Sequence, residues 1–198
     1  MNEKFFTLKQ EKQDKMINGA MEVFAKKGYA KASTDDMVKV AGVSKGLWFH
    51  YFENKIGLYT FMVEYAIKYM NMELETNQVG GSNNYFEVAM QVEGTKVTLA
   101  RLYPFIPLLL ASMEVEDDPE ALAVINDSLA TYKEKIAKAY ENVRNSDFKP
   151  EVSRTQLDMT MKYTLTGLLK EDYANGFDGE RYILKVQDYL DMMAKICY

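Results

Sequence analysis

The residues best suited to bind a charged ligand in this 198-residue chain are Ser44, Lys45 and Gly46. A serine in front of a helix-forming run is a typical N-terminal cap, so a short helix should begin here. The backbone N–H groups and the dipole at a helix N-terminus attract anions, and Lys45 adds a positive charge. These residues therefore predict recognition of phosphate.

Two short helices are expected to position this tripeptide. The first begins near Thr34 and ends at Gly42, and the second follows Ser44 and continues to about Tyr51. Apolar side chains on the two helices have spacings that could build a small shared core: Met37, Ala41, Val43, Trp48 and Tyr51. We assign Trp48 to this core, with a base contact as the alternative. This arrangement is typical of a helix-turn-helix, whose second helix lies in the major groove of DNA.

Charge is unevenly distributed along the chain. The net charge is −5, but residues 1–55 hold ten lysines and seven acidic residues, which gives +3 and leaves −8 for residues 56–198. Such asymmetry is expected when one module faces phosphate. No arginine precedes Arg101. Because arginine is the side chain that most often reads guanine, we expect DNA recognition here to favour A·T pairs and DNA shape.

Helical periodicity continues through the rest of the chain. We expect helices over about Lys9–Lys27 and Lys55–Asn77, a loop at Val79–Asn84, and a helix start at Asp117–Glu120. The helical pattern resumes from about Tyr85, and Pro104 and Pro107 should kink or break that helix. No segment alternates as a strand would, so the sequence predicts an all-α fold of about nine helices.

Residues 16–58 resemble the N-terminal domain of the TetR family of bacterial transcriptional regulators. The residues that carry the resemblance are Ala20, Phe24, Gly28-Tyr29, Thr34, Met37, Ala41–Gly46, Phe49–Phe52, Asn54-Lys55 and Leu58. The resemblance implies a three-helix helix-turn-helix DNA-binding domain over residues 1–55. It also implies an all-helical effector-binding and dimerisation domain over residues 56–198.

The function that the resemblance implies is ligand-responsive regulation of transcription, usually repression. Such a protein binds a palindromic double-stranded DNA operator as a homodimer and is released by a small-molecule effector, with no cofactor. The alternative is a TetR-like co-regulator or nucleoid-associated factor that acts mainly through protein partners.

The resemblance also assigns site residues by position. The recognition-helix candidates are Ser44, Lys45, Gly46, Leu47, His50 and Tyr51, and the backbone-phosphate candidates are Thr34 and Lys55. For His50, the only histidine, we favour a DNA contact, with a structural or solvent-facing role and a sensor role as the alternatives. A lone histidine cannot build a metal site.

Apolar stripes run along the last two predicted helices. They consist of Leu157, Met161, Leu165 and Leu168 on one helix, and of Tyr182, Val186, Tyr189, Met193 and Ile196 on the other. Part of this surface must serve the chain's own core. The two stripes together are too wide for one neighbour, so we expect a dimer interface of two helices per subunit.

Methionine and aromatic residues are frequent in the middle of the chain. Such residues suit a pocket for an apolar or aromatic ligand, although core packing explains them equally well. The pocket candidates are Met90, Tyr103, Phe105, Met113, Tyr132, Met159 and Tyr163.

Other classes of protein fit the sequence poorly. A di-metal helical bundle needs Glu-x-x-His pairs, and no histidine lies outside the helix-turn-helix segment, so we predict that the chain is not an enzyme. Cys197 is the single cysteine, which excludes an internal disulfide framework. The longest apolar run, Phe105–Met113, is too short to span a bilayer. We therefore expect a cytoplasmic protein without a membrane partner.

Overall fold

The computed structural model describes residues 3–198, and all regular structure in that range is helical. Its elements are η1 (Glu3–Thr7), α1 (Gln10–Lys31), α2 (Thr34–Ala41), α3 (Lys45–Tyr51), α4 (Lys55–Thr76), α5 (Tyr85–Ala100), α6 (Ile106–Met113), α7 (Pro119–Ala139), η2 (Asn145–Asp147), α8 (Arg154–Ala174) and α9 (Gly179–Cys197). The predicted all-α class and the number of α-helices are confirmed for the described residues. No helix in residues 3–198 combines the length and the apolar character needed to cross a bilayer.

Local sequence signals determine where the early helices begin and end. At the start of α2, the Ser33 hydroxyl accepts a hydrogen bond from the N–H of Asp36 at 3.1 Å. At the start of α3, Ser44 accepts one from the N–H of Leu47 at 3.3 Å. Helix α2 ends at Gly42 in the left-handed conformation, with φ at 63°, as the sequence predicts.

Helix α1 extends beyond its predicted end. Gly28 adopts a positive φ of 70°, which favours glycine because no Cβ meets the backbone. The chain kinks there instead of stopping, and one further turn continues to Lys31. The break of helical geometry at Gly28 agrees with the predicted helix end, and the turn up to Lys31 follows this break.

The chain divides into two compact units. The first comprises the described residues up to Met70 together with Leu99–Tyr132, and the second comprises Asn71–Thr98 together with Lys133–Tyr198. The whole predicted helix-turn-helix lies in the first unit. The predicted domain boundary after residue 55 stays a prediction.

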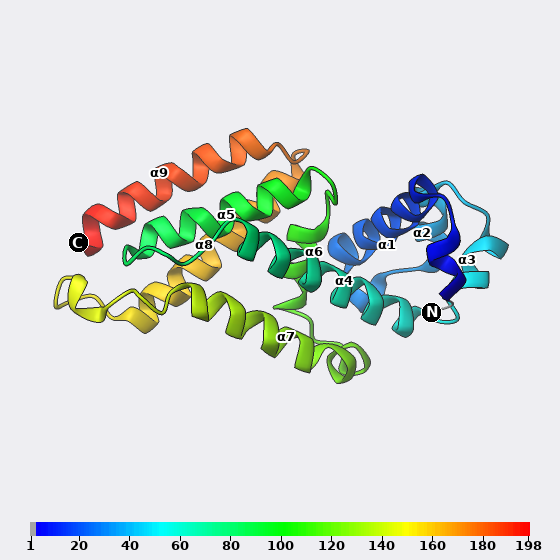
Figure 1. Cartoon of the computed structure of the whole chain (residues 1–198), viewed down its shortest axis with the longest axis horizontal. Helices are drawn as coiled ribbons and strands as arrows, with labels where there is room; N and C mark the ends of the chain where they lie inside the picture. Colours follow the sequence, from blue (N-terminus) through cyan, green and yellow to red (C-terminus); the bar gives the residue numbers. More distant parts are fainter. Residues whose placement is uncertain (1–2) are drawn as a thin grey trace. The chain divides into compact units, whose positions relative to one another are not determined.

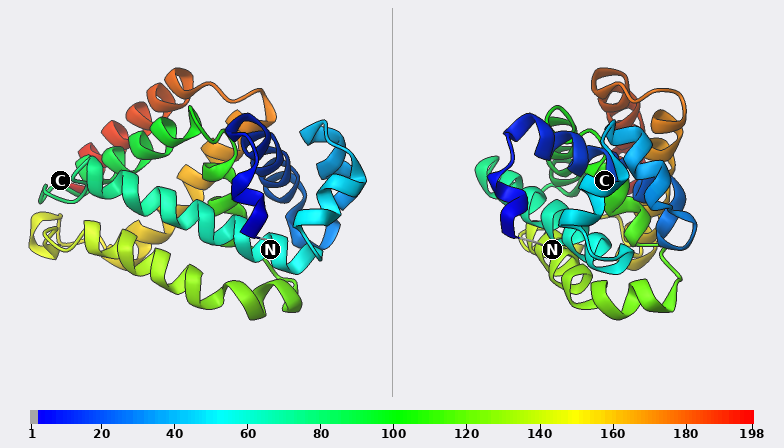
Figure 2. Two further views of the ribbon diagram at one scale, coloured as in Figure 1. Left: turned by 45° about the vertical axis from the view of Figure 1, so that its right-hand side comes forward. Right: turned by 90° about the vertical axis from the view of Figure 1, so that its right-hand side faces the viewer.

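In the first unit, α1 packs against both α2 and α6 (Figures 1 and 2). Helices α1 and α2 approach closely at Gly19, where a Cβ would lie 2.9 Å from both the Cβ and the backbone nitrogen of Ala41. The N-terminal η1 is held by the fully buried Phe5. The Phe5 ring centroid lies 5.8 Å from that of Tyr51 and 5.2 Å from that of Phe52, so η1 supports the end of α3.

In the second unit, α9 lies along α5 (Figures 1 and 2). The buried hydroxyl of Tyr182 on α9 donates a 2.6 Å hydrogen bond to the Glu93 carboxylate on α5. At the start of α9, a Cβ on Gly179 would lie 2.6 Å from Val97 Cγ1, so a larger residue cannot fit without movement. These contacts fix α9 against α5.

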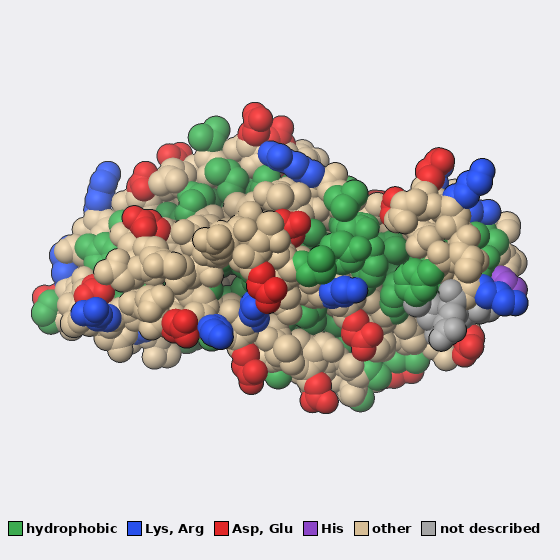
Figure 3. Space-filling view, in the orientation of Figure 1, with side chains coloured by type: hydrophobic (Ala, Val, Ile, Leu, Met, Phe, Trp, Pro, Cys, Tyr) green, Lys and Arg blue, Asp and Glu red, His purple; other side chains and the backbone are tan. Residues whose placement is uncertain are grey.

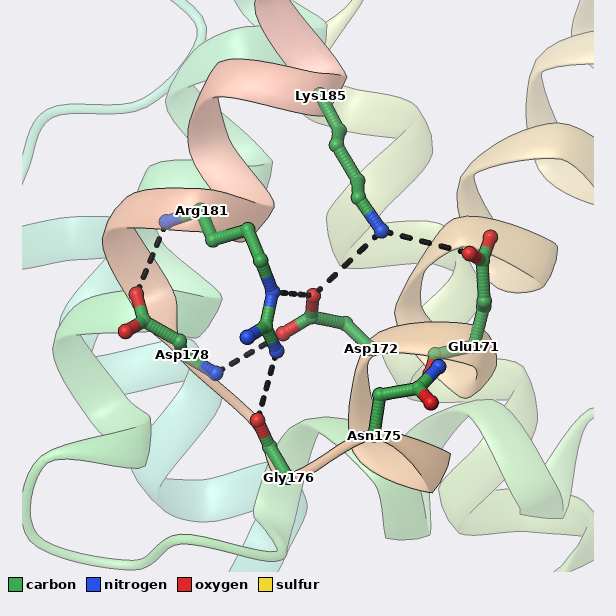
Figure 4. Close-up of polar contacts among 7 residues, drawn as sticks. All are labelled: Glu171, Asp172, Asn175, Gly176, Asp178, Arg181 and Lys185. Carbon is green, nitrogen blue, oxygen red and sulfur yellow. Dashed lines mark hydrogen bonds and ion pairs between the residues drawn. The ribbon is translucent and has the colours of Figure 1, made fainter.

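A network of polar contacts joins α8 to α9, and its central group is the fully buried carboxylate of Asp172 (Figure 4). Arg181 Nε donates to Asp172 at 2.7 Å, and the N–H of Asp178 donates at 2.9 Å. Burial opposes the charged form, but the hydrogen bonds from Arg181 and Asp178 and the positive charges outweigh it, so the pKa of Asp172 is lowered.

Replacing Asp172 with asparagine is expected to destabilise the chain by about 1–3 kcal/mol at pH 7, because Arg181 loses its buried charged partner. The folded-state pKa of Asp172 is depressed, so its contribution is present above the unfolded-state pKa of about 3.9 and is lost as the pH falls through the lower folded-state value. Urea unfolding of the wild type and the variant measures the difference at neutral and acid pH.

The matched control for this prediction is Glu171→Gln. Glu171 is more than half exposed and contacts Lys185 at 3.5 Å, so this substitution should change stability little. The stabilising role of the Asp172 carboxylate would be contradicted if the two substitutions lowered stability equally. It would also be contradicted if Asp172→Asn were still less stable than the wild type at low pH.

Candidate nucleic-acid interface

The predicted helix-turn-helix is present as α2 and α3, joined by residues 42–44. The turn is closed by hydrogen bonds from the N–H of Gly42 to the carbonyl of Lys39 and from the N–H of Val43 to the carbonyl of Val38, both at 3.3 Å. The geometry follows from two local signals, the left-handed glycine and the Ser44 cap. The structural part of the prediction is therefore confirmed.

Buried side chains support α3 from behind. Trp48 and Met37 are fully buried and Ala41 is nearly so, which agrees with the shared core expected between the two helices, whereas Val43 is partly exposed. The indole ring of Trp48 is 5.2 Å from the ring of Phe52, measured between centroids. The interpretation of Trp48 as a core residue is confirmed.

The opposite side of α3 is exposed to solvent. Of the predicted contact residues, Ser44, Lys45, Gly46 and His50 are exposed, and Thr34 and Leu47 are partly exposed. Lysine side chains and the histidine lie at the outer edge of the α2–α3 region in Figure 3. We had not predicted Phe49, which is nearly half exposed one helical turn after Lys45. Its spacing from Lys45 was a usable signal, because residues four apart share a helix face.

An acidic neighbour balances the charge of Lys45. Lys45 Nζ lies 2.6 Å from Asp35 Oδ1, and the two side chains are 59% and 70% exposed. Such an exposed pair contributes little to stability, so the ammonium can exchange its carboxylate partner for a phosphate. Nearby, the Ser33 hydroxyl and Lys27 lower the pKa of Asp36, which keeps a second negative charge at the start of α2.

Two predicted contact residues face inward. Tyr51 is buried, and its ring contacts Phe5, so it supports α3 and does not present its ring to DNA. Lys55 Nζ donates to the carbonyl of Tyr29 at 3.0 Å and lies 4.2 Å above the ring of that residue. The ammonium of Lys55 is thus engaged within the chain. The burial of Tyr51 agrees with its place in the predicted shared core and not with a DNA contact. The sequence missed the Lys55 contact because it joins segments that are distant in sequence.

The predicted pocket residues fall into three groups. Tyr103, Met113 and Tyr132 are buried, while Phe105 and Met90 are partly exposed. Met159 and Tyr163 are 51% and 66% exposed on α8, so their assignment to a pocket in the chain is wrong. A cavity of about 160 Å³ at Gly80 and a groove of about 460 Å³ at Lys12 contain none of the seven. The remaining five stay predictions.

The predicted dimer residues also need correction. Leu157, Met161, Leu165, Tyr182 and Val186 are buried within the chain and have no surface to offer a second copy, whereas Leu168, Tyr189 and Met193 are partly exposed. The exposed apolar side chains of these helices include Met159 and Tyr163 on α8 and Met192 and Ile196 on α9. The stripe chosen from periodicity is largely the core-facing side, and Ile196, at 56%, is its one member that is more than half exposed.

The two short helices α2 and α3, the glycine turn between them and the exposed side of α3 assign the chain to the class of helix-turn-helix proteins. Comparison with known proteins shows which family of helix-turn-helix proteins the chain resembles. Residues 16–60 match the family model described as bacterial regulatory proteins, tetR family. The predicted resemblance of the N-terminal segment to the TetR family is therefore confirmed.

Curated relatives and solved structures agree with this family. The chain is 25% identical over 125 residues to YvdT, an uncharacterised HTH-type transcriptional regulator of Bacillus subtilis. The aligned region covers 63% of this chain and 64% of YvdT. The chain is also 25% identical over 138 residues to IcaR of Staphylococcus aureus strain Newman. That aligned region covers 65% of this chain and 69% of IcaR. The match with YvdT thus spans less than two thirds of that relative.

The fold likeness extends over nearly the whole chain. A TetR family transcriptional regulator from Chloroflexus aurantiacus superposes with a TM-score of 0.66 at 15% identity, covering 99% of this chain and 97% of the other. PfmR, a TetR family transcriptional regulator from Thermus thermophilus, gives a TM-score of 0.55 at 18% identity, with coverages of 89% and 95%. At these identities the likeness shows a common fold.

Proposed function

We propose that the chain is a cytoplasmic transcriptional repressor that binds a palindromic DNA operator as a homodimer and leaves it when a small apolar or aromatic effector binds. The observation that carries the proposal is the exposed tip of α3, where Ser44, Lys45 and Gly46 face solvent above a buried Trp48. A rigid helix with an exposed, cationic N-terminal end fits the major groove. IcaR, a relative, is named a negative transcriptional regulator of a biofilm operon, which supports repression.

The experiment that tests the proposal is selection of binding sites from random double-stranded DNA with the full chain. We expect two inverted half-sites whose centres lie about 34–36 Å apart, or a multiple of that distance. The half-sites should be rich in A·T pairs, because no arginine precedes Arg101 and guanine is most often read by arginine. Failure to enrich any sequence would count against specific DNA binding, and strict guanines in the half-sites would remove the A·T preference.

The exposed apolar side chains of α8 and α9 support the homodimer. Met159 and Tyr163 on α8, and Met192 and Ile196 on α9, leave large apolar areas in water in the single chain. Burial of apolar area is the dominant favourable contribution to most protein–protein association. We assign the dimer contact to these residues in place of the buried stripe.

Tyr163→Glu is expected to weaken dimerisation at least about 100-fold, because a symmetric interface would bury the new charge twice. Sedimentation velocity over a concentration series measures the association. The matched control is Val124→Glu, a similar change at an exposed residue of α7. A dimer that tolerates Tyr163→Glu as well as it tolerates Val124→Glu would place the interface elsewhere.

The effector is proposed to bind among the aromatic residues of the middle helices, for which Tyr103, Phe105, Met113 and Tyr132 remain candidates. A solved structure of similar fold, LfrR from Mycobacterium smegmatis, was determined in complex with proflavine and has a TM-score of 0.51 at 15% identity. An effector that binds a second helix arrangement more tightly would shift the population away from the DNA-binding form. Couplings of this kind change affinity by about 5–150-fold.

A further inference from the structure

Tyr29 makes polar contacts through its backbone and through its side chain. It directly follows the kink of α1 at Gly28, and it is almost fully buried. Its N–H donates a 3.0 Å hydrogen bond to Glu116 Oε2, in the turn between α6 and α7. The same carboxylate oxygen lies 3.4 Å from the hydroxyl of Tyr59 on α4. Glu116 therefore binds the end of α1 at the point where the helix is kinked.

The other contacts of Tyr29 come from α7 and α4. Its hydroxyl donates a 2.6 Å hydrogen bond to Glu120 Oε2 in the first turn of α7. Its carbonyl accepts one from Lys55 Nζ at 3.0 Å, and the same ammonium lies 3.5 Å from the carbonyl of Ala32 and 4.2 Å above the Tyr29 ring. We call Tyr29, Lys55, Glu116 and Glu120 the Tyr29 cluster.

We propose that Tyr29 is a positioning residue, through which the α6–α7 turn and the first residue of α4 hold the end of α1, and with it the helix-turn-helix, at one angle. Helix α2 begins at Thr34, five residues after Tyr29. Any rotation of the last turn of α1 is therefore passed directly to α2. Hydrogen bonds to charged partners have strict geometry, and three of them converge on this one residue.

The cluster also offers a route for regulation, which rests on the proposed function. Two of the remaining pocket candidates flank it in sequence, since Met113 ends α6 and Tyr132 lies on α7. An effector that shifts the α6–α7 turn would pull Glu116 away from the N–H of Tyr29 and release the end of α1. The core of the helix-turn-helix, at Met37 and Trp48, has no hydrogen bond to this cluster and would stay folded.

Hydrogen exchange on the full chain tests the proposal without DNA. In Glu116→Ala, the amide of Tyr29 should exchange about 10-fold faster or more, because a hydrogen bond to a charged group is lost. The amide of Met37 should keep its wild-type rate. Asp117→Asn is the matched control, since it removes one negative charge from an exposed residue of the same turn. The proposal is wrong if the two variants behave alike, or if exchange at Met37 rises in step with Tyr29.

Operator affinity provides the second readout. Tyr29→Phe and Glu120→Ala remove the same hydrogen bond, so their effects should be non-additive in the double variant. Glu120→Gln keeps an acceptor for the hydroxyl and should retain most of the affinity. Additive effects would overturn a role for the hydroxyl in positioning. If the wild type binds no DNA, the proposed function fails, while the exchange rate at Tyr29 still decides whether Glu116 holds α1.

Discussion

Gly19→Ala is expected to destabilise the chain by about 1–3 kcal/mol, although alanine is the better helix former. The new Cβ would lie 2.9 Å from the Cβ and the backbone nitrogen of Ala41 and 3.1 Å from its Cα. Backbone atoms cannot swing aside as the end of a flexible side chain can. Helices α1 and α2 must therefore separate, which opens the core beneath the helix-turn-helix. Urea unfolding monitored by the fluorescence of Trp48 measures the loss.

A matched substitution separates this clash from helix propensity. Gly94 is also inside a helix, and a Cβ there meets no atom within 4 Å. Gly94→Ala should therefore stabilise the chain by up to about 1 kcal/mol, through propensity alone. Our account of the α1–α2 contact would fail if Gly19→Ala were as stabilising as Gly94→Ala.

Lys45→Ala is expected to weaken operator binding about 10- to 100-fold and to make its dependence on salt less steep. Two copies of Lys45 would neutralise phosphates on a dimeric complex, and each lost contact lowers the number of released counterions by about one. Filter binding or fluorescence anisotropy at salt concentrations of about 50 to 200 mM, measured on the selected operator, gives both the affinity and the slope. Loss of affinity with an unchanged slope would show that Lys45 reads a base edge.

Removing the charge of Asp35 should change operator affinity in the opposite direction. Because Asp35 Oδ1 lies 2.6 Å from Lys45 Nζ, Asp35→Asn should free the ammonium and tighten binding. The gain should vanish in the Lys45→Ala background, since the two residues act as a pair. An Asp35→Asn gain that survives without Lys45 would mean that Asp35 repels DNA directly.

Part of the candidate site could be predicted from sequence because its signals are local. Ser44 caps the helix that follows it, and Gly42 adopts the left-handed conformation that ends α2. The apolar spacing that predicted a buried Trp48 depends only on the turn of one helix. The same spacing placed Tyr51 in the shared core, but the side chains that contact Tyr51 and Lys55, Phe5 and Tyr29, are distant in the chain. No spacing rule within α3 or α4 contains that information.

The sequence by itself determined the all-helical class, the helix-turn-helix and its exposed lysine tip. Caps, glycines and helical periods act over a few residues, so their effect depends little on distant parts of the chain. Only the tertiary structure decided which side of α8 and α9 the core uses, because an apolar side chain is buried only if another element covers it. Tyr182 is covered by α5 and Tyr163 is not, although both are tyrosines on the last two helices of the chain.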